Sequence, residues 1–159
     1  MPIYLPELKG EKRAGLYIIS ATKNAKHFKV GKSVDIQKRL DQYHLCFPTG
    51  FYIHGILLMK KNSNFGQLFT RNVQKPKNLI SYTAGIWEKM LVSNLIDKGA
   101  REVVVEDEVK TRTRSEWLEI KDKTIITKAL DDLYKTEYEH FVKPYYNFKP
   151  VKFHLAYKN

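Results

Sequence analysis

The sequence is poor in cysteine: it contains one, Cys46, among 159 residues. A lone cysteine excludes an intramolecular disulfide framework and is typical of a reducing compartment. Together with only five histidines, it makes a structural zinc site a poor interpretation. Because Cys46 lies between Leu45 and Phe47, we expect it to be a small buried residue and not a nucleophile.

The sequence also lacks an apolar run long enough to span a bilayer, and its first 13 residues contain no signal-peptide core. We therefore expect an intracellular protein, cytoplasmic or nuclear, that has no membrane partner. Hydrophobic residues make up 43% of the chain and aromatic residues 13%, which excludes a disordered chain. At this length, the composition predicts one compact domain with its own core.

Acidic residues are scarce relative to basic ones. The chain has 28 Lys and Arg against 17 Asp and Glu, a formal net charge of +11. Such an excess favours a polyanionic partner, most often nucleic acid, although a solubilising surface charge is the plainer alternative. Ten Tyr, eight Phe and two Trp supply rings that can alternate with these cations, as on many nucleic-acid-binding surfaces.

Apolar runs and turn residues predict a mixture of strands and helices. We expect strands at 16–20, 28–30, 51–59, 103–105 and 117–120, and helices at 34–44, 84–98 and 124–135. In this interpretation Gly31 forms a tight turn, Ser33 caps the first helix, 106–114 is a charged turn and Gly99 ends the second helix. An entry segment (1–13), a domain (14–142) with an inserted loop at about 60–81, and a basic aromatic tail (143–159) complete the expected organisation.

The stretch 15-GLYIISATKNAKHFKVGKSVDIQKRL-40 places a phenol and two cations close together. Tyr17 interrupts an apolar run, while Lys32 and Arg39 follow Gly31. A glycine turn that opens a helix offers backbone N–H groups to a phosphate, and the two cations would add to that site. The plainer interpretation is a core tyrosine, a solvated basic face and a glycine with positive φ.

Glu88 is a second candidate for chemistry. On a helical wheel it lies near Leu91 and Leu95, at the margin of the apolar face. A carboxylate there is costly unless it is paired with a cation or binds a metal. An ion pair is the plainer alternative, whereas one carboxylate with phosphate and water is the usual way in which Mg²⁺ is held.

Several short motifs follow one another along the chain: Gly15-Leu16-Tyr17, Lys29-Val30-Gly31-Lys32-Ser33, Asp35-Ile36-Gln37-Lys38-Arg39-Leu40 and Trp87-Glu88-Lys89. In order and spacing they resemble the GIY-YIG endonuclease superfamily, in its phage and viral branch, over about residues 14–120. The resemblance implies an α/β (α+β) fold, in which helices flank a small three-stranded mixed or antiparallel central sheet. It also implies a metal-dependent endonuclease that hydrolyses phosphodiester bonds in DNA.

The same resemblance implies the site residues. Tyr17 would take a proton from the attacking water, Arg39 would hold the scissile phosphate, and Glu88 would bind Mg²⁺ or Mn²⁺. Lys32 would stabilise the phenolate form of the tyrosine. The expected nucleic-acid contacts are Lys29, Lys32, Ser33, Lys38 and Arg39.

One departure from the motifs leaves two outcomes open. Lys29 stands where the second motif has a tyrosine, so the chain reads Lys-Val-Gly at that point. Either Tyr43 supplies the missing phenol or Lys29 contacts phosphate by its charge. The alternative to an enzyme is a catalytically inactive GIY-YIG-like module that only binds nucleic acid, and a third is a basic scaffold protein. The expected partner is DNA, branched or of specific sequence, with RNA less favoured.

Overall fold

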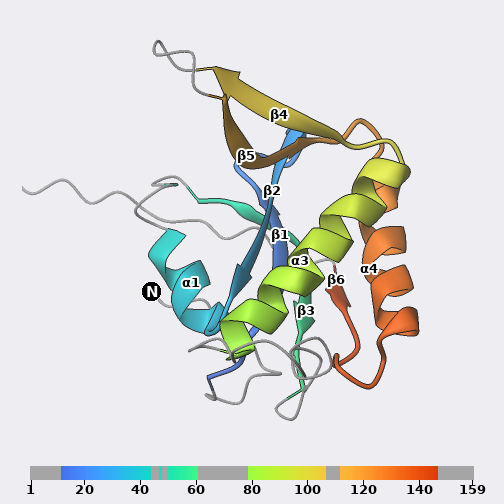
Figure 1. Cartoon of the computed structure of the whole chain (residues 1–159). Helices are drawn as coiled ribbons and strands as arrows, with labels where there is room; N and C mark the ends of the chain where they lie inside the picture. The colour runs from blue at the N-terminus through green and yellow to red at the C-terminus, as the bar shows by residue number, and fades with distance from the viewer. Residues whose placement is uncertain (1–11, 44–46, 48–49, 61–78, 107–111, 147–159) are drawn as a thin grey trace, which may run out of the picture.

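A computed structural model describes residues 12–43, 47, 50–60, 79–106 and 112–146, excluding the side chains of 79, 104–106 and 112–116 (Figure 1). The expectations for Cys46, for most of the entry segment and inserted loop, and for the tail beyond residue 146 lie outside the described residues.

One antiparallel sheet runs through the domain in the order β4-β5-β2-β1-β3-β6. Its strands are β1 (Gly15–Ser20), β2 (His27–Ser33), β3 (Tyr52–Leu58), β4 (Arg101–Glu106), β5 (Arg112–Glu119) and β6 (Tyr145–Tyr146). The α+β class is confirmed, but the expected three-stranded sheet is too small, because the sheet has six strands. Residues 112–114, which the sequence predicts to be in a charged turn, belong to β5 and extend the sheet.

The helices are α1 (Ile36–Gln42), α3 (Leu79–Asp97) and α4 (Thr124–Thr136), and they cover both faces of the sheet (Figure 1). Alternate residues of β1 point into two separate cores. Leu16 and Ile18 belong to the core under α3 and α4, whereas Tyr17 and Ile19 belong to the core under α1.

In the part of the chain that the structure describes, no helix combines the length and apolarity that a bilayer span requires.

The predicted glycine turn and Ser33 cap are both wrong. Gly31 lies within β2, which continues to Ser33, and the positive φ angles among the described glycines are at Gly50 and Gly99. The N-cap of α1 is Asp35, whose carboxylate accepts a hydrogen bond of 3.1 Å from the Lys38 N–H. The Ser33 hydroxyl bonds within the turn instead, because it donates to the Asp35 carbonyl at 2.8 Å.

Helix α3 begins at Leu79, five residues before the predicted start. Its first turns carry exposed apolar side chains, Ile80 and Tyr82, so the helical pattern of buried residues does not extend to them. The expected core residues Trp87, Leu91 and Leu95 are all fully buried. The predicted end is confirmed, since Gly99 has a φ of 115° and its N–H donates to the Ile96 carbonyl.

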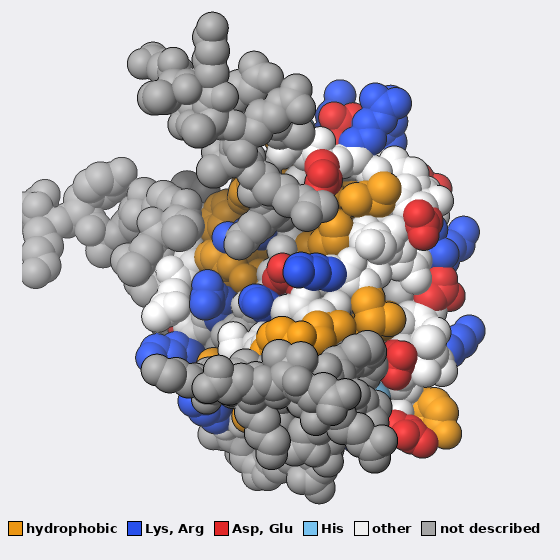
Figure 2. Space-filling model, viewed as in Figure 1, with side chains coloured by type: hydrophobic (Ala, Val, Ile, Leu, Met, Phe, Trp, Pro, Cys, Tyr) orange, Lys and Arg blue, Asp and Glu red, His pale blue; other side chains and the backbone are white. Residues whose placement is uncertain are grey.

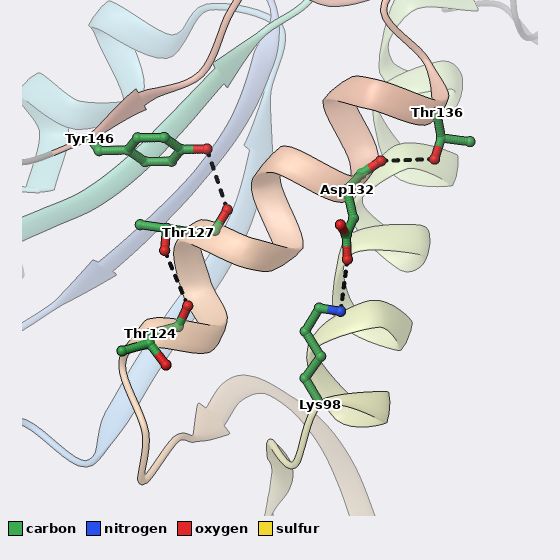
Figure 3. A network of polar contacts seen from close by, with 6 residues as sticks. All are labelled: Lys98, Thr124, Thr127, Asp132, Thr136 and Tyr146. Carbon is green, nitrogen blue, oxygen red and sulfur yellow. Dashed lines mark hydrogen bonds and ion pairs between the residues drawn. The ribbon is translucent and has the colours of Figure 1, made fainter.

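Polar contacts fasten α4 to its neighbours (Figure 3). The Lys98 ammonium, just after α3, lies 2.7 Å from the Asp132 carboxylate on α4. From β6, the Tyr146 hydroxyl donates to the Asp131 carboxylate and has the Thr127 carbonyl 3.4 Å away as a weaker acceptor. These contacts fix α4 beside α3 and hold β6 against the end of the sheet.

Candidate functional site at the open edge of β2

Strand β2 is flanked by two strands along only part of its length. Strand β1 pairs with β2 from Lys29 to Ser33, but β5 pairs only with His27, Phe28 and Lys29. Within the described residues, Val30–Ser33 therefore has a strand neighbour on one side only. Helix α1 follows β2 on one face of the sheet, and α3 packs across the other face (Figure 1). Side chains from both faces can therefore reach this open edge.

A pair of phenols lies on the α1 side of the edge. Tyr17 stands opposite Gly31 in the β1–β2 register, and a Cβ at Gly31 would lie only 2.2 Å from the Tyr17 hydroxyl oxygen. That hydroxyl is hydrogen-bonded to the hydroxyl of Tyr43, and the two rings meet edge to face at 5.7 Å. Tyr17 is 1% exposed and Tyr43 is 5% exposed. The glycine therefore makes room for a buried phenol, and a left-handed backbone is not the reason for it.

Lys29 joins this pair from β2. Its ammonium lies 5.3 Å from the centroid of the Tyr43 ring, within the range of a cation–π interaction. Lys29 and Gly31 are two residues apart on one strand, so their Cα–Cβ directions share a face of the sheet. Lys29 therefore contacts Tyr43, the residue one helical turn after Arg39.

Lys32 points to the other face, toward α3. A Cβ at Gly85 would lie 2.7 Å from the Lys32 Nζ atom, so the amine occupies the space that a side chain would fill. Glu88 follows Gly85 by three residues and therefore lies on the same side of the helix. Lys32 and Glu88 are both half-buried. Lys32 and Glu88 thus lie at one margin of α3.

Arg39 is exposed in the last turn of α1. It precedes Tyr43 by four residues, so the two residues lie on one stripe of the helix. Tyr43 contacts both Lys29 of β2 and Tyr17 of β1, so its own side chain faces the sheet. Figure 2 shows basic side chains gathered over the surface between α1 and α3, with an acidic side chain beside them.

The structure brings Tyr17, Tyr43 and Lys29 into contact and places Lys32 on the margin of α3 that carries Glu88. Lys38 is exposed on α1, while Ser33 is buried and its hydroxyl is used in the turn. The sequence interpretation missed Gly85. Glycine within a helix costs about 1 kcal/mol relative to alanine, so its position in an otherwise regular helix was an available signal.

A metal ion at this site would depend on one carboxylate. No group of three or more His, Cys, Asp or Glu side chains that could hold a metal occurs among the described residues. The carboxylate of Glu88 is a hard oxygen donor of the kind that Mg²⁺ and Mn²⁺ prefer. The residues present therefore fit an ion whose other ligands are phosphate oxygens and water.

The fold and the site define a small basic α+β domain with tyrosines, lysines, an arginine and a glutamate around the edge of an antiparallel sheet. The chain belongs to the T5orf172 domain family, which matches residues 14–135. The resemblance to the GIY-YIG superfamily is therefore wrong, because the family that matches is a different one. The motifs behind the resemblance are short, and Lys29 already departed from them. No curated protein and no solved structure matches the chain.

Proposed function

We propose that this protein is a metal-dependent endonuclease that hydrolyses phosphodiester bonds in DNA at the open edge of β2. The placement of two glycines carries the proposal. On the α1 face of the sheet, Gly31 leaves room for the Tyr17 hydroxyl. On the α3 face, Gly85 leaves room for the Lys32 ammonium. Because both positions are glycine, a phenol and a cation can both lie near the open edge of β2.

Arg39 and Lys32 bind the phosphate in this proposal. The exposed Arg39 guanidinium offers a fork of N–H donors that matches two phosphoryl oxygens. Lys32 adds a compact charge beside α3. Together they stabilise the negative charge that develops on the phosphoryl oxygens in the transition state.

The phenol pair supplies the base. The Tyr17 and Tyr43 hydroxyls are hydrogen-bonded to each other, and the Lys29 ammonium lies over the Tyr43 ring. The pair then takes a proton from the attacking water. Glu88 would hold a Mg²⁺ or Mn²⁺ ion, which when bound supplies Lewis-acid stabilisation of the phosphoryl oxygens and the leaving oxygen.

A second function, nucleic-acid binding without cleavage, is favoured by one observation. Tyr17 and Tyr43 are both nearly inaccessible and bonded to each other, as expected for a structural pair in the core. In that case the net charge of +11 and the exposed cations serve binding alone.

A cleavage assay and a binding assay, run on the same proteins, separate the two functions. Supercoiled plasmid and branched DNA are incubated with Mg²⁺ or Mn²⁺ and with wild type, Glu88→Gln or the control Glu139→Gln, an exposed carboxylate after α4. We expect cleavage by wild type and the control, and a loss of at least about 100-fold in Glu88→Gln with binding retained. If no protein cleaves and all bind equally, the binding module replaces the nuclease.

A further inference from the structure

A row of aromatic rings extends from the phenol pair along the α1 face of the sheet. The Tyr43 ring lies 5.9 Å from Phe47, and the Phe47 ring lies 6.4 Å from Trp117. Phe51 is fully buried and lies 5.8 Å from Phe47, so it supports the row from inside. We call Tyr43, Phe47 and Trp117 the aromatic row.

The exposed fractions change along the aromatic row. Tyr43 is 5% exposed, whereas Phe47 and Trp117 are half-buried and keep part of their surface accessible within the described chain. Trp117 pairs with Lys29 in the β2–β5 register, so the two residues lie side by side on one face of the sheet. The outer end of the row therefore combines accessible ring surface with an ammonium group.

We propose that Trp117 binds an unpaired nucleobase by stacking, with the tilted Phe47 ring against the edge of that base, while Lys29 contacts the phosphate of the same nucleotide. This inference rests on the proposed function and narrows its substrate to nucleic acid with a single-stranded or extruded nucleotide next to the cleaved bond. Accessible rings interleaved with cations are the usual platform for single strands, because every base has a face that can stack. The charge of Lys29 and the net charge of +11 select a polyanion over an apolar peptide as the occupant.

A regular duplex cannot use the aromatic row in this way. Its bases stack on one another and present only their edges in the grooves, so their faces are not available to Trp117. Flaps, bulges, junctions and single strands offer at least one free base face. The inference therefore predicts a preference for such structures over blunt duplex of the same length.

Tryptophan fluorescence tests the stacking directly, because the chain has two tryptophans in different environments. Trp87 is fully buried and Trp117 is half-buried. With EDTA present to prevent cleavage, we expect a short single-stranded oligonucleotide to quench the emission of wild type. In Trp117→Phe, where Trp87 alone emits, the same oligonucleotide should cause no quenching. Equal quenching in the two proteins would overturn the inference.

Binding measurements on a second variant keep the inference testable apart from fluorescence. Trp117→Leu removes the ring, and we expect its affinity for the single strand to fall by about tenfold with duplex affinity unchanged. Trp117→Phe keeps a smaller ring and should recover part of the loss. Thermal melting confirms that both variants are folded. Equal losses for single strand and duplex would overturn the inference, since they indicate a structural role.

Failure of the inference and failure of the proposed function give different results. If wild type cleaves DNA but shows no preference that depends on Trp117, the nuclease stands and the stacking site falls. If binding of single strands depends on Trp117 but no substrate is cleaved, the stacking site stands and the nuclease falls.

Discussion

Lys32 reaches from β2 to α3, where its Nζ atom lies 2.7 Å from the position that a Cβ on Gly85 would occupy. The two residues are far apart in sequence: one is a lysine in a strand, and the other is a glycine in a helix. The Lys32 ammonium occupies the space that a side chain at position 85 would fill, and this accounts for the glycine at that position. This pair also brings a positive charge to the margin of α3 that carries Glu88.

Gly85→Ala should therefore separate stability from activity. A new Cβ would displace the flexible end of Lys32, while alanine favours the helix by about 1 kcal/mol over glycine. We expect an unchanged or higher melting temperature and a cleavage rate that is lower by about tenfold. Ser93→Ala, at an exposed position on the same helix, is the matched control. An unchanged cleavage rate in Gly85→Ala would show that the position of Lys32 does not matter.

Gly31→Ala should destabilise the protein, whereas Gly85→Ala should not. A Cβ at Gly31 would lie 2.2 Å from the Tyr17 ring, which is 1% exposed. We expect a loss of about 1–3 kcal/mol in the free energy of unfolding, measured by urea denaturation. In a Tyr17→Leu background, which lacks the ring atoms, the same substitution should cost less. An equal cost in both backgrounds would contradict the packing described for Gly31.

The hydrogen bond between Tyr17 and Tyr43 can be measured by a double-mutant cycle. Either Tyr→Phe change deprives the other buried hydroxyl of this partner, at a cost of about 1–2 kcal/mol. The double variant loses both hydroxyls together, so it should be less destabilised than the sum of the single changes. Strict additivity of the three unfolding free energies would indicate that the two hydroxyls do not interact.

His54 makes stability depend on pH. Burial, with a smaller contribution from the charge of Lys123, lowers the pKa of His54 from 6.5 to about 4, and the Ser20 hydroxyl lies 2.7 Å from its Nε2 atom. The unfolded chain therefore binds a proton between pH 6.5 and 4 that the folded chain does not, so stability falls as the pH falls through this range. Above pH 6.5 both states are neutral at this residue and the effect is absent.

His54→Gln isolates this contribution from those of the carboxylates. Because His54 is only half-buried, we expect wild type to lose about 1–2 kcal/mol more than the variant between pH 7 and pH 4.5. Urea denaturation at several pH values provides the measurement. Parallel stability curves for the two proteins would contradict a shifted pKa at His54.

The sequence predicted well the elements that one apolar pattern specifies. Strand β1 and helix α4 lie where their apolar patterns placed them, and Gly99 ends α3 as expected. It predicted only the end of β5, because much of that strand is polar and one of its two partners, β2, lies far away in sequence. Local patterning indicated at least part of each strand from β1 to β5 but missed β6, whose pairing with β3 joins distant parts of the chain, and the three-stranded sheet was an expectation from the resemblance alone.

For the candidate site, too, the sequence indicated the residues but not their arrangement in space. The sequence indicated Tyr17, Lys32, Arg39 and Glu88 as candidates, but it could not show which face of β2 each one uses. The mistaken turn at Gly31 has this origin, because a glycine that accommodates a ring from the neighbouring strand looks the same in sequence as a glycine in a turn. Likewise, the family was misjudged from a few short motifs, whereas the family that matches covers residues 14–135.

The central claim is that cations at the open edge of β2 hold a phosphate for cleavage, and Arg39 tests it most directly. The measurement is the single-turnover rate of DNA cleavage with Mg²⁺ or Mn²⁺ for wild type, Arg39→Ala, Arg39→Lys and the control Lys128→Ala, an exposed cation on α4. We predict a loss of at least about 100-fold in both Arg39 variants, because a lysine lacks the fork of donors, and less than about threefold in the control. Rates for Arg39→Ala within about threefold of wild type would contradict the account.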